Sequence, residues 1–424
     1  MALIALVIPF VILLIIGFPI AFNLLLSSIC YLLFSGYPLT LTCQRMFEGM
    51  NSFALLAVPF FILTGQLMLK GHLLKSLTDF INSFIGHVRG ALALVTVGSC
   101  LFLGAIVGLA LAEIASLGSF LIPMMKKEGY KPAFSSAVMA TSSLLGPIMP
   151  PSVLMILYCM AVGRTSIAGL FLAAIFPAIL IAICQMLIIY FIAKKRNLPN
   201  HPKTNWPEKW VQFRKSLPAL LLPVIILGGI FGRIFTVTEA SVVAALYAFV
   251  LTFFVFKEAK WSDLPEIFLE TALTSGMVII LAGAATVTAW AIANEQLIYI
   301  LIKPFSNVPV WVFLLFVNIL LLLNGMFMDD YASVVVLGPI IAPIAWKLGV
   351  DPLHIGAIIC INLVIGLSTP PFGIALFVTS PMAGVTIEDT VKEAIPLIFV
   401  SVAVLFLVTY IPQICLWLPR LMGY

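Results

Sequence analysis

Charged side chains are scarce in this sequence. Asp, Glu, Lys and Arg together make up 9% of its 424 residues, whereas a soluble domain carries about 25%. Hydrophobic residues account for 62%, and the mean hydropathy is +1.19. This balance excludes a water-soluble globular domain, because too few charged groups remain to cover its surface. It indicates a polytopic membrane protein.

Cysteine and histidine are too few and too scattered to build a reactive centre. The seven cysteines include no Cys-x-x-Cys pair, and the four histidines are dispersed. Neither pattern suits a metal site or a nucleophile with its base. The sequence also lacks the nucleotide-binding pattern Gly-x-x-x-x-Gly-Lys-[Ser/Thr], which argues against direct use of ATP. We therefore expect a protein that is not an enzyme and has no cofactor.

Long apolar runs are abundant, and several approach or exceed the roughly 20 residues that a helix needs to cross a bilayer. Lipid accepts only helices and closed barrels, because every backbone group must be satisfied internally. We expect an all-α fold. The N-terminal run lacks a basic region and a small-residue cleavage site, so we expect it to remain in the membrane. The runs are Ala2–Ile16, continuing past Gly17 to Phe34, then Gly169–Ala193, Leu217–Phe231, Ala240–Phe256, Val310–Leu323 and Ile395–Leu418.

The net charge of +5 is concentrated in one polar stretch, Lys194–Lys215, which contains a single acid, Glu208. Lys and Arg in short loops mark the cytoplasmic side of a membrane protein. Pro199, Pro202 and Pro207 prevent one continuous helix here. We interpret the stretch as a cytoplasmic linker, and not as a nucleic-acid-binding patch.

The same rare motif occurs twice, 220 positions apart: Gly146–Pro151 corresponds to Gly366–Pro371. Chance in an apolar sequence would match Leu with Leu, but would not align Gly, Pro and Lys at one offset. We infer a duplication. The upstream matches at this offset are Leu117-Gly118 with Leu337-Gly338, Pro123 with Pro343, Lys127 with Lys347, Gly129 with Gly349, Pro132 with Pro352 and Ala137 with Ala357.

The duplication divides the chain into a first half, residues 1–200, a basic linker, 201–216, and a second half, 217–424. An odd number of membrane crossings per half would invert the second copy. We therefore expect an all-α polytopic membrane protein with two inverted structural repeats. Each repeat would contain a re-entrant helical hairpin, near residues 90–152 and 324–373.

Each motif is a helix-breaking Gly-x-x-x-Pro-Pro within an apolar run. Proline leaves carbonyl groups without donors, and glycine allows close approach to the backbone. Free carbonyls beside Ser, Thr and Asn side chains suit Na⁺, and the N-terminus of a half-helix suits a carboxylate. Two broken segments at matching positions indicate the binding site of a transporter, so we expect the breaks to meet. The alternative is a structural kink that neighbouring helices satisfy.

Two adjacent acids, Asp329 and Asp330, follow the segment Asn324–Met328. Ionisable residues at membrane depth are candidates for ion binding or coupling. Asp is also favoured at the start of a helix, so capping of Tyr331–Lys347 is the alternative.

Three other charged residues lie in apolar surroundings. Glu113 is either a functional acid or an interfacial or paired one. Arg164 is interpreted as an interfacial anchor, with attraction of an anion as the alternative. Glu239, in the segment Thr236–Ala240, is interpreted as part of a helix cap.

Several motifs together resemble those of the large membrane subunit of tripartite ATP-independent periplasmic (TRAP) transporters, over essentially the whole length. They are Gly17–Ala21, Val58–Gly65, Leu117-Gly118 through Ile122-Pro123, Gly146–Ser152, Thr238–Ala240, Gly325–Asp329 and Thr369–Gly373.

The resemblance implies an elevator-type secondary transporter of the bacterial inner membrane, in which a mobile transport domain holds Na⁺ and substrate and moves past a static scaffold. It implies Na⁺ symport of an organic acid, from a class that includes dicarboxylates, sialic acids and other sugar acids. It also implies a small four-helix membrane subunit and a soluble periplasmic binding protein as partners, in an unfused arrangement. The alternative is a stand-alone inverted-repeat Na⁺/carboxylate transporter.

The chemistry of the breaks and the resemblance together assign the candidate residues. The segment Gly104–Ala110 is poorer in serine than the family pattern, so only backbone Na⁺ ligands are expected there. The predicted Na⁺ ligands are Ser142, Ser143, Gly146, Asn324, Gly325, Asp329, Gly366, Ser368 and Thr369. The predicted substrate-binding residues are Gly104, Glu113, Pro150, Ser152, Pro370 and Gly373.

Overall fold

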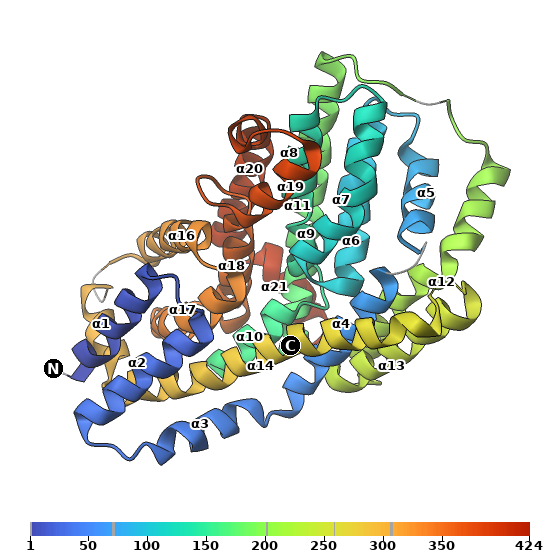
Figure 1. The fold of residues 1–424 in the computed structure, drawn as a ribbon. Helices are drawn as coiled ribbons and strands as arrows, with labels where there is room; N and C mark the ends of the chain where they lie inside the picture. The colour runs from blue at the N-terminus through green and yellow to red at the C-terminus, as the bar shows by residue number, and fades with distance from the viewer. Residues whose placement is uncertain (1, 70–72, 201, 258, 306–307) are drawn as a thin grey trace.

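The structure is a computed structural model that describes all residues except 1, 70–72, 201, 258 and 306–307 (Figure 1). The described residues form helices and no strands. Within the part of the chain that the structure describes, six helices are long and apolar enough to cross a membrane, or up to eight if each of two bent pairs is one span. Large apolar side chains such as Phe191, Met277 and Phe399 are exposed, as expected for surfaces that face lipid. The prediction of an all-α polytopic membrane protein is confirmed.

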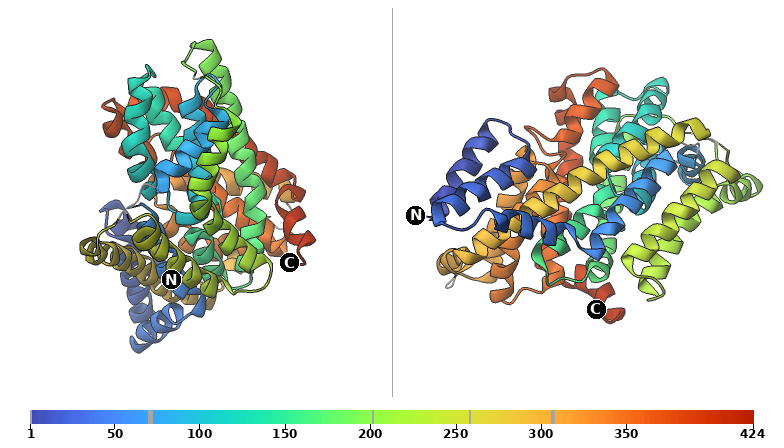
Figure 2. Two further views of the ribbon diagram at one scale, coloured as in Figure 1. Left: turned by 90° about the vertical axis from the view of Figure 1, so that its right-hand side faces the viewer. Right: turned by 60° about the horizontal axis from the view of Figure 1, so that its bottom comes forward.

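One group of helices lies at the periphery. The longest of them, α14, runs diagonally across one face of the molecule (Figure 2) and packs against α2, α3 and α4. The bounds are α1 Ala2–Ile15, α2 Ile20–Ser35, α3 Thr40–Met50, α4 Ala57–Leu69, α5 Leu73–Ile85, α12 Trp206–Phe231, α13 Val237–Val250, α14 Leu264–Asn294 and α15 Leu297–Ile302, with short turns at Phe53–Leu56, Leu251–Val255, Trp261–Asp263 and Lys303–Phe305.

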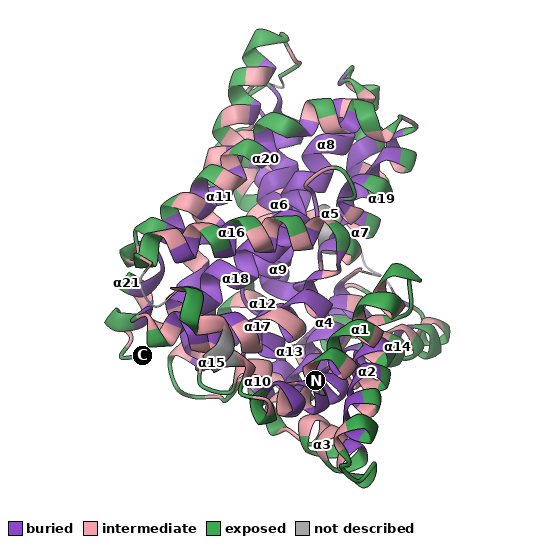
Figure 3. Ribbon diagram, turned by 90° about the vertical axis from the view of Figure 1, so that its left-hand side faces the viewer, coloured by how far each residue is buried: buried purple, intermediate pink, exposed green. Residues whose placement is uncertain are grey.

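The remaining helices form the central part of the molecule, where α9 and α18 are buried (Figure 3). In the first half they are α6 Ala91–Val107, α7 Ala110–Lys127, α8 Pro132–Ser142, α9 Leu145–Ile148, α10 Val153–Val162 and α11 Ile167–Lys195. In the second half they are α16 Val310–Phe327, α17 Asp330–Lys347, α18 Pro352–Gly366, α19 Ile374–Ala383, α20 Ile387–Tyr410 and α21 Gln413–Leu421.

Helix ends recur at the spacing of the repeated motif. Helix α7 begins at residue 110 and ends at 127, and α17 begins at 330 and ends at 347, each 220 positions later. Gly129 and Gly349 follow these helices, both with φ +85°, a conformation that glycine adopts without steric cost. Pro132 and Pro352 then occupy the first position of α8 and α18, where a missing N–H does no harm. The shared Gly and Pro positions therefore act as shared helix stops and starts.

The two halves exchange helices in the centre of the molecule. Helix α10 of the first half packs on α17 and α18, and α19 of the second half packs on α7 and α8. Two repeated glycines lie at these crossings. A methyl group on Gly118 would lie 3.1 Å from Met382 of α19, and one on Gly338 would lie 3.3 Å from Val162 of α10. The absence of a side chain at each glycine allows the exchanged helix to approach closely.

Two details refine the predicted organisation. The region 90–152 holds two separate elements: a helix pair, α6–α7, linked by Gly108 and Leu109, and a broken helix, α8–α10. The region 324–373 likewise contains the link between α16 and α17 and the broken helix α18–α19. The linker predicted over 201–216 is partly helical, because α12 begins at Trp206. Pro207 is tolerated in its first turn, where it loses no helical hydrogen bond.

Candidate ion and substrate site

The first helix break lies between α8 and α10. Pro147 has no N–H, and the Gly146 N–H donates to the carbonyl of Ser143, three residues back, at 3.2 Å. The Ser142 carbonyl therefore loses the donor that an uninterrupted α-helix would supply. The Ser142 hydroxyl is buried and has no hydrogen-bond partner. The break leaves Ser142 with oxygen atoms that its own helix does not satisfy.

Two other serines of the first break are used locally. The Ser143 hydroxyl donates to the carbonyl of Ala140 at 3.0 Å. The Ser152 hydroxyl donates to the carbonyl of Pro147 and accepts from the Met155 N–H at 3.3 Å, as the N-cap of α10. In this conformation both side chains make hydrogen bonds within the break, as expected for the alternative of a structural kink.

The α6–α7 link packs directly on the first break. A methyl group on Gly104 would lie 2.8 Å from the Cα of Gly146, and one on Gly108 would lie 2.7 Å from the carbonyl oxygen of Pro151. Gly108 also has φ +66°, which side chains disfavour. Any side chain at these two positions would push the link and the break apart.

The second break, between α18 and α19, is a tight turn. The N–H groups of Leu367, Ser368 and Thr369 donate three residues back, at 3.0, 3.2 and 3.0 Å. The Thr369 hydroxyl donates to the carbonyl of Ile365 at 2.8 Å, which leaves its oxygen lone pairs able to face a cation. Gly373 closes the turn, and a methyl group there would lie 2.8 Å from the carbonyl oxygen of Leu367.

The α16–α17 link packs on the second break in the same way. A methyl group on Gly325 would lie 3.0 Å from the Cα of Gly366, and the reverse contact would be 2.6 Å. Beside this pair, the Asn324 amide donates to the hydroxyl of Ser333 across the link. In each half, a glycine near the end of the helix before the link thus packs against a glycine of the break.

Asp329 is the N-cap of α17. Its Oδ2 accepts from the N–H groups of Tyr331 at 3.1 Å and Ala332 at 3.4 Å. Asp330 is buried, and its Oδ1 accepts from the Tyr331 N–H at 3.1 Å. The capping alternative is confirmed for Asp329, and a role in Na⁺ coupling stays a prediction.

A cavity of about 270 Å³ lies where the two links face each other. Helices α7 and α19 begin at this cavity, and neither has a side-chain cap. The first N–H groups of a helix have no partner within it and carry a partial positive charge, which suits an anion. No Lys, Arg or His occurs among the described residues that line the cavity: Gln66, Leu109–Ala112, Thr274, Asp329–Tyr331, Leu367 and Ile374.

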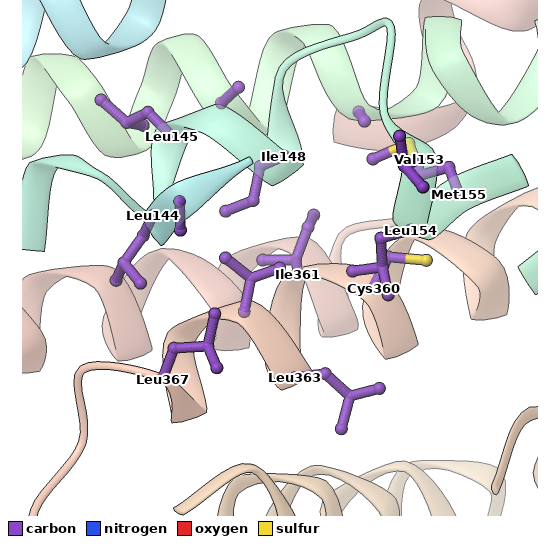
Figure 4. Packing of buried hydrophobic residues seen from close by; sticks show 14 of the residues in the cluster. Leu144, Leu145, Ile148, Val153, Leu154, Met155, Cys360, Ile361, Leu363 and Leu367 are labelled. Atoms are coloured by element: carbon purple, nitrogen blue, oxygen red, sulfur yellow. The ribbon is translucent and has the colours of Figure 1, made fainter. Parts of the chain in front are cut away.

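The breaks meet as predicted, but the cavity does not lie between them. Helix α9 of the first break contacts α18, and Leu144 and Ile148 occupy the space toward Ile361 and Leu367 (Figure 4). Apolar packing fills this contact, because α9 and most of α18 are buried. The open space is instead between the two links.

The predicted residues therefore form two groups. One, at the first break, comprises Gly104, Glu113, Ser142, Ser143, Gly146, Pro150 and Ser152, and the other, at the second break, comprises Asn324, Gly325, Asp329, Gly366, Ser368, Thr369, Pro370 and Gly373. Of these residues only Asp329 lines the cavity, and none of the predicted substrate-binding residues does.

The cavity residues that were not predicted include Gln66 on α4 and Thr274 on α14. Both are polar residues within apolar helices. A polar residue within an apolar helix can be recognised in the sequence, but many such residues only form a hydrogen bond with their own helix.

Other charged residues have structural roles. Glu239 and Thr236 form a capping box at the start of α13, with the Thr236 N–H donating to Glu239 at 2.8 Å, as predicted. The exposed Arg164 lies over the ring of Trp346, 5.9 Å from its centroid.

Comparison with known proteins identifies the family. Residues 7–414 match the family described as tripartite ATP-independent periplasmic transporter, DctM component. The chain belongs to this family. A C4-dicarboxylate TRAP transporter large permease of Pseudomonas aeruginosa is 38% identical over 94% of this chain and 93% of its own length. A sialic acid TRAP transporter large permease of Vibrio cholerae is 37% identical over 96% of this chain and 96% of its own.

Two further comparisons bear on architecture. The isethionate TRAP transporter permease DctMQ of Oleidesulfovibrio alaskensis is 36% identical over 96% of this chain, which spans 64% of that longer protein. The solved structure of the Alcanivorax borkumensis YdaH transporter has a TM-score of 0.64 and 16% identity, over 89% of both chains, and it supports the fold alone. This TRAP large permease is a multi-pass protein of the inner membrane, and its named relatives are permeases.

Proposed function

We propose that this TRAP permease imports an organic anion of the dicarboxylate or sugar-acid class by Na⁺ symport. The observation that carries the proposal is the cavity between the two links, where α7 and α19 begin without a side-chain cap. A substrate carboxylate placed there would accept hydrogen bonds from backbone N–H groups at the positive ends of two helices. The names of the relatives, which include C4-dicarboxylate and sialic acid permeases, support the same class.

The charges around the cavity support Na⁺ coupling. Asp329 and Asp330 lie in its wall, and no basic side chain does among the described residues. An anion entering this site therefore needs a cation to offset repulsion in a low-dielectric region. The oxygen atoms at the two breaks, including those of Ser142 and Thr369, are suitable Na⁺ ligands.

The walls of the cavity support an elevator mechanism. Most come from the central helices, whereas Gln66 and Thr274 belong to the peripheral helices α4 and α14. A second cavity between α14 and the central helices α10 and α17 is lined by the small residues Ala282, Ala285 and Ala289 of α14. Small side chains do not interlock with the opposing surface, so the central helices can slide past this scaffold and carry the cavity with them.

Two partners complete the proposed system. A small four-helix membrane subunit would account for the additional length of the DctMQ relative, and a periplasmic binding protein would fit a family described as a tripartite periplasmic transporter. The binding protein would deliver the organic acid.

The test is uptake into proteoliposomes that contain the permease and its small subunit. C4-dicarboxylates, sialic acid and isethionate are each supplied with the cognate binding protein, with and without an inward Na⁺ gradient. We expect accumulation of one of these anions only with Na⁺ and binding protein together. Accumulation that persists without a Na⁺ gradient would refute symport.

The same assay separates the alternative function. Uptake of free substrate at full rate without any binding protein would instead establish a stand-alone Na⁺/carboxylate transporter.

A further inference from the structure

Two polar side chains of the cavity between the links have no hydrogen-bond partner in the protein. They are Gln66 on α4 and Thr274 on α14, and neither bonds to a residue that the structure describes. Thr64, two positions before Gln66, instead donates to the carbonyl of Phe60 at 2.8 Å. A polar group left without a partner inside an apolar helix is costly. Gln66 and Thr274 therefore require a partner that lies in the cavity.

Helix α14 provides an internal comparison, because it contains four threonines. Thr271, Thr286 and Thr288 each donate to the carbonyl of the residue four positions back, at 2.7, 2.9 and 3.3 Å. This is a common arrangement for a threonine within a helix. Thr274 makes no such bond, and it is the threonine of α14 that lines this cavity. Its hydroxyl therefore remains able to donate to or accept from a ligand.

Gln66 and Thr274 belong to one side of the cavity, since α4 packs on α14. An amide group donates two hydrogen bonds and accepts others, and a hydroxyl group donates one and accepts others. Both groups are uncharged. They are therefore suited to hydroxyl or amide groups of a ligand, and they cannot neutralise a charged one.

The charges in the wall disfavour a second carboxylate on the substrate. Asp329 and Asp330 are the charged residues among the described ones that line the cavity. Helices α7 and α19 pack on each other, so in the proposed function both of their uncapped starts hold the same carboxylate. A second carboxylate would meet either like charge or the uncharged Gln66 and Thr274. An unpaired charge in such a place costs more than a hydroxyl group that finds a partner.

We propose that Gln66 and Thr274 determine specificity by binding uncharged polar groups of the substrate, so that the permease takes an acid with one carboxylate and several hydroxyl groups in preference to a dicarboxylate. The inference rests on the proposed function and selects one of its two substrate classes. Since α4 and α14 belong to the static scaffold of the proposed elevator, the two contacts exist only while the cavity lies against these helices.

The experiment measures binding of free acids to the purified complex of permease and small subunit. The binding protein is left out, so that only the membrane site selects. Thermal stabilisation is titrated with D-glucuronate, D-gluconate, sialic acid, succinate and hexanoate at constant NaCl and ionic strength. The first three carry one carboxylate and several hydroxyl groups, succinate carries two carboxylates, and hexanoate carries one carboxylate and no hydroxyl group. We expect at least one hydroxylated acid to bind at a concentration about tenfold lower than succinate and hexanoate require.

Gln66→Leu and Thr274→Val remove the polar atoms and keep the approximate size of each side chain. Each should raise the concentration of the best hydroxylated acid for half-maximal stabilisation about three- to tenfold, as expected for the loss of one or two hydrogen bonds. The melting temperature in NaCl without an acid should stay the same, whereas a merely structural role would change it. The matched control is Thr271→Val, because that hydroxyl bonds to its own helix, and it should change neither quantity.

A conservative variant covers the case in which Thr274→Val is unstable. Thr274→Ser keeps the hydroxyl group and should bind the acids as the wild type does.

The possible failures are distinct. Succinate binding as tight as that of the hydroxylated acids, or unchanged affinity in both Gln66→Leu and Thr274→Val, would overturn the inference and leave the proposed symport intact. The inference also fails if none of the three hydroxylated acids stabilises the wild type. The proposed function fails separately, if the complete system with its binding protein accumulates no organic anion in response to a Na⁺ gradient.

Discussion

Two glycine pairs fix the distance between each link and its helix break. At the second break, Gly325 and Gly366 are so close that a methyl group on Gly366 would lie 2.6 Å from the Cα of Gly325. Main-chain atoms cannot rotate away from such a contact as a flexible side chain can. The position of the link relative to the break therefore depends on the absence of two side chains.

We predict that Gly366→Ala destabilises the permease by about 1–3 kcal/mol, as overpacking does, and reduces Na⁺-driven uptake by at least about tenfold. The measurements are thermal unfolding in detergent and uptake in proteoliposomes. The control is Gly276→Ala in α14, where a methyl group would meet nothing within 4 Å. Equal behaviour of the two variants would show that the close approach is unimportant.

Asp329 allows capping to be separated from coupling. Asn caps a helix about as well as Asp does, so Asp329→Asn should keep the stability of α17 while it impairs coupling of uptake to Na⁺. Asp329→Ala should in addition lose about 1 kcal/mol of unfolding free energy. The measurements are thermal unfolding and the ratio of Na⁺ to substrate transported. A wild-type ratio in Asp329→Asn would limit this residue to the cap.

At the scale of the element, we expect a hydroxyl group at a helix break to contribute to Na⁺ binding, and one within an uninterrupted helix not to contribute. Thr369 and Thr271 both donate to the carbonyl four residues back, at 2.8 and 2.7 Å. Thr369 lies at the second break, and Thr271 lies within the uninterrupted α14.

We predict that Thr369→Val raises the Na⁺ concentration for half-maximal uptake severalfold, because the hydroxyl oxygen is lost from the break. Thr271→Val removes the same kind of hydrogen bond and should leave Na⁺ activation unaltered. Both variants are compared by Na⁺ titration of uptake at equal amounts of protein. A similar effect of the two substitutions would attribute the loss to helix stability, and Ser368→Ala provides a second substitution at the break.

Helix starts and stops were the most predictable elements. Proline and glycine act locally, so Pro132, Gly129 and the repeated Gly-x-x-x-Pro-Pro motif identify where helices end without reference to the rest of the fold. The exchange of α10 and α19 was not predictable. Gly118 and Gly338 indicate that something approaches closely, but a glycine does not specify which helix approaches it.

The candidate site was predictable in its parts and not in its arrangement. The residues of both breaks were identified, because rare motifs inside apolar runs stand out. The position of the cavity depends on which loops face each other, and that is a property of packing across the halves. Glu113 illustrates the difference: its presence in an apolar run was visible, but its contact with Gly146 was not.

At the scale of the whole molecule, the basic connection between the halves predicts the orientation of the protein in the membrane. The described part of this connection between α11 and α12 includes the exposed residues Lys203 and Asn205. Clustered Lys and Arg predict that it faces the cytoplasm.

We predict that Asn205→Cys, in a variant whose seven native cysteines are replaced, reacts with a membrane-impermeant maleimide only when the reagent has access to the cytoplasm. The measurement compares intact spheroplasts with inside-out vesicles. A membrane-permeant maleimide should label both preparations and serves as the control. Labelling in intact spheroplasts would reverse the orientation.

The exchanged packing of α10 and α19 has a consequence for how the molecule is put together. Neither half of the chain covers its own central helices, since α10 packs on the second half and α19 packs on the first. Cleavage of the connection before Trp206 would leave two fragments that the packing of α10 and α19 holds together. During synthesis, the contact surface of α10 therefore stays uncovered until α17 and α18 have been made.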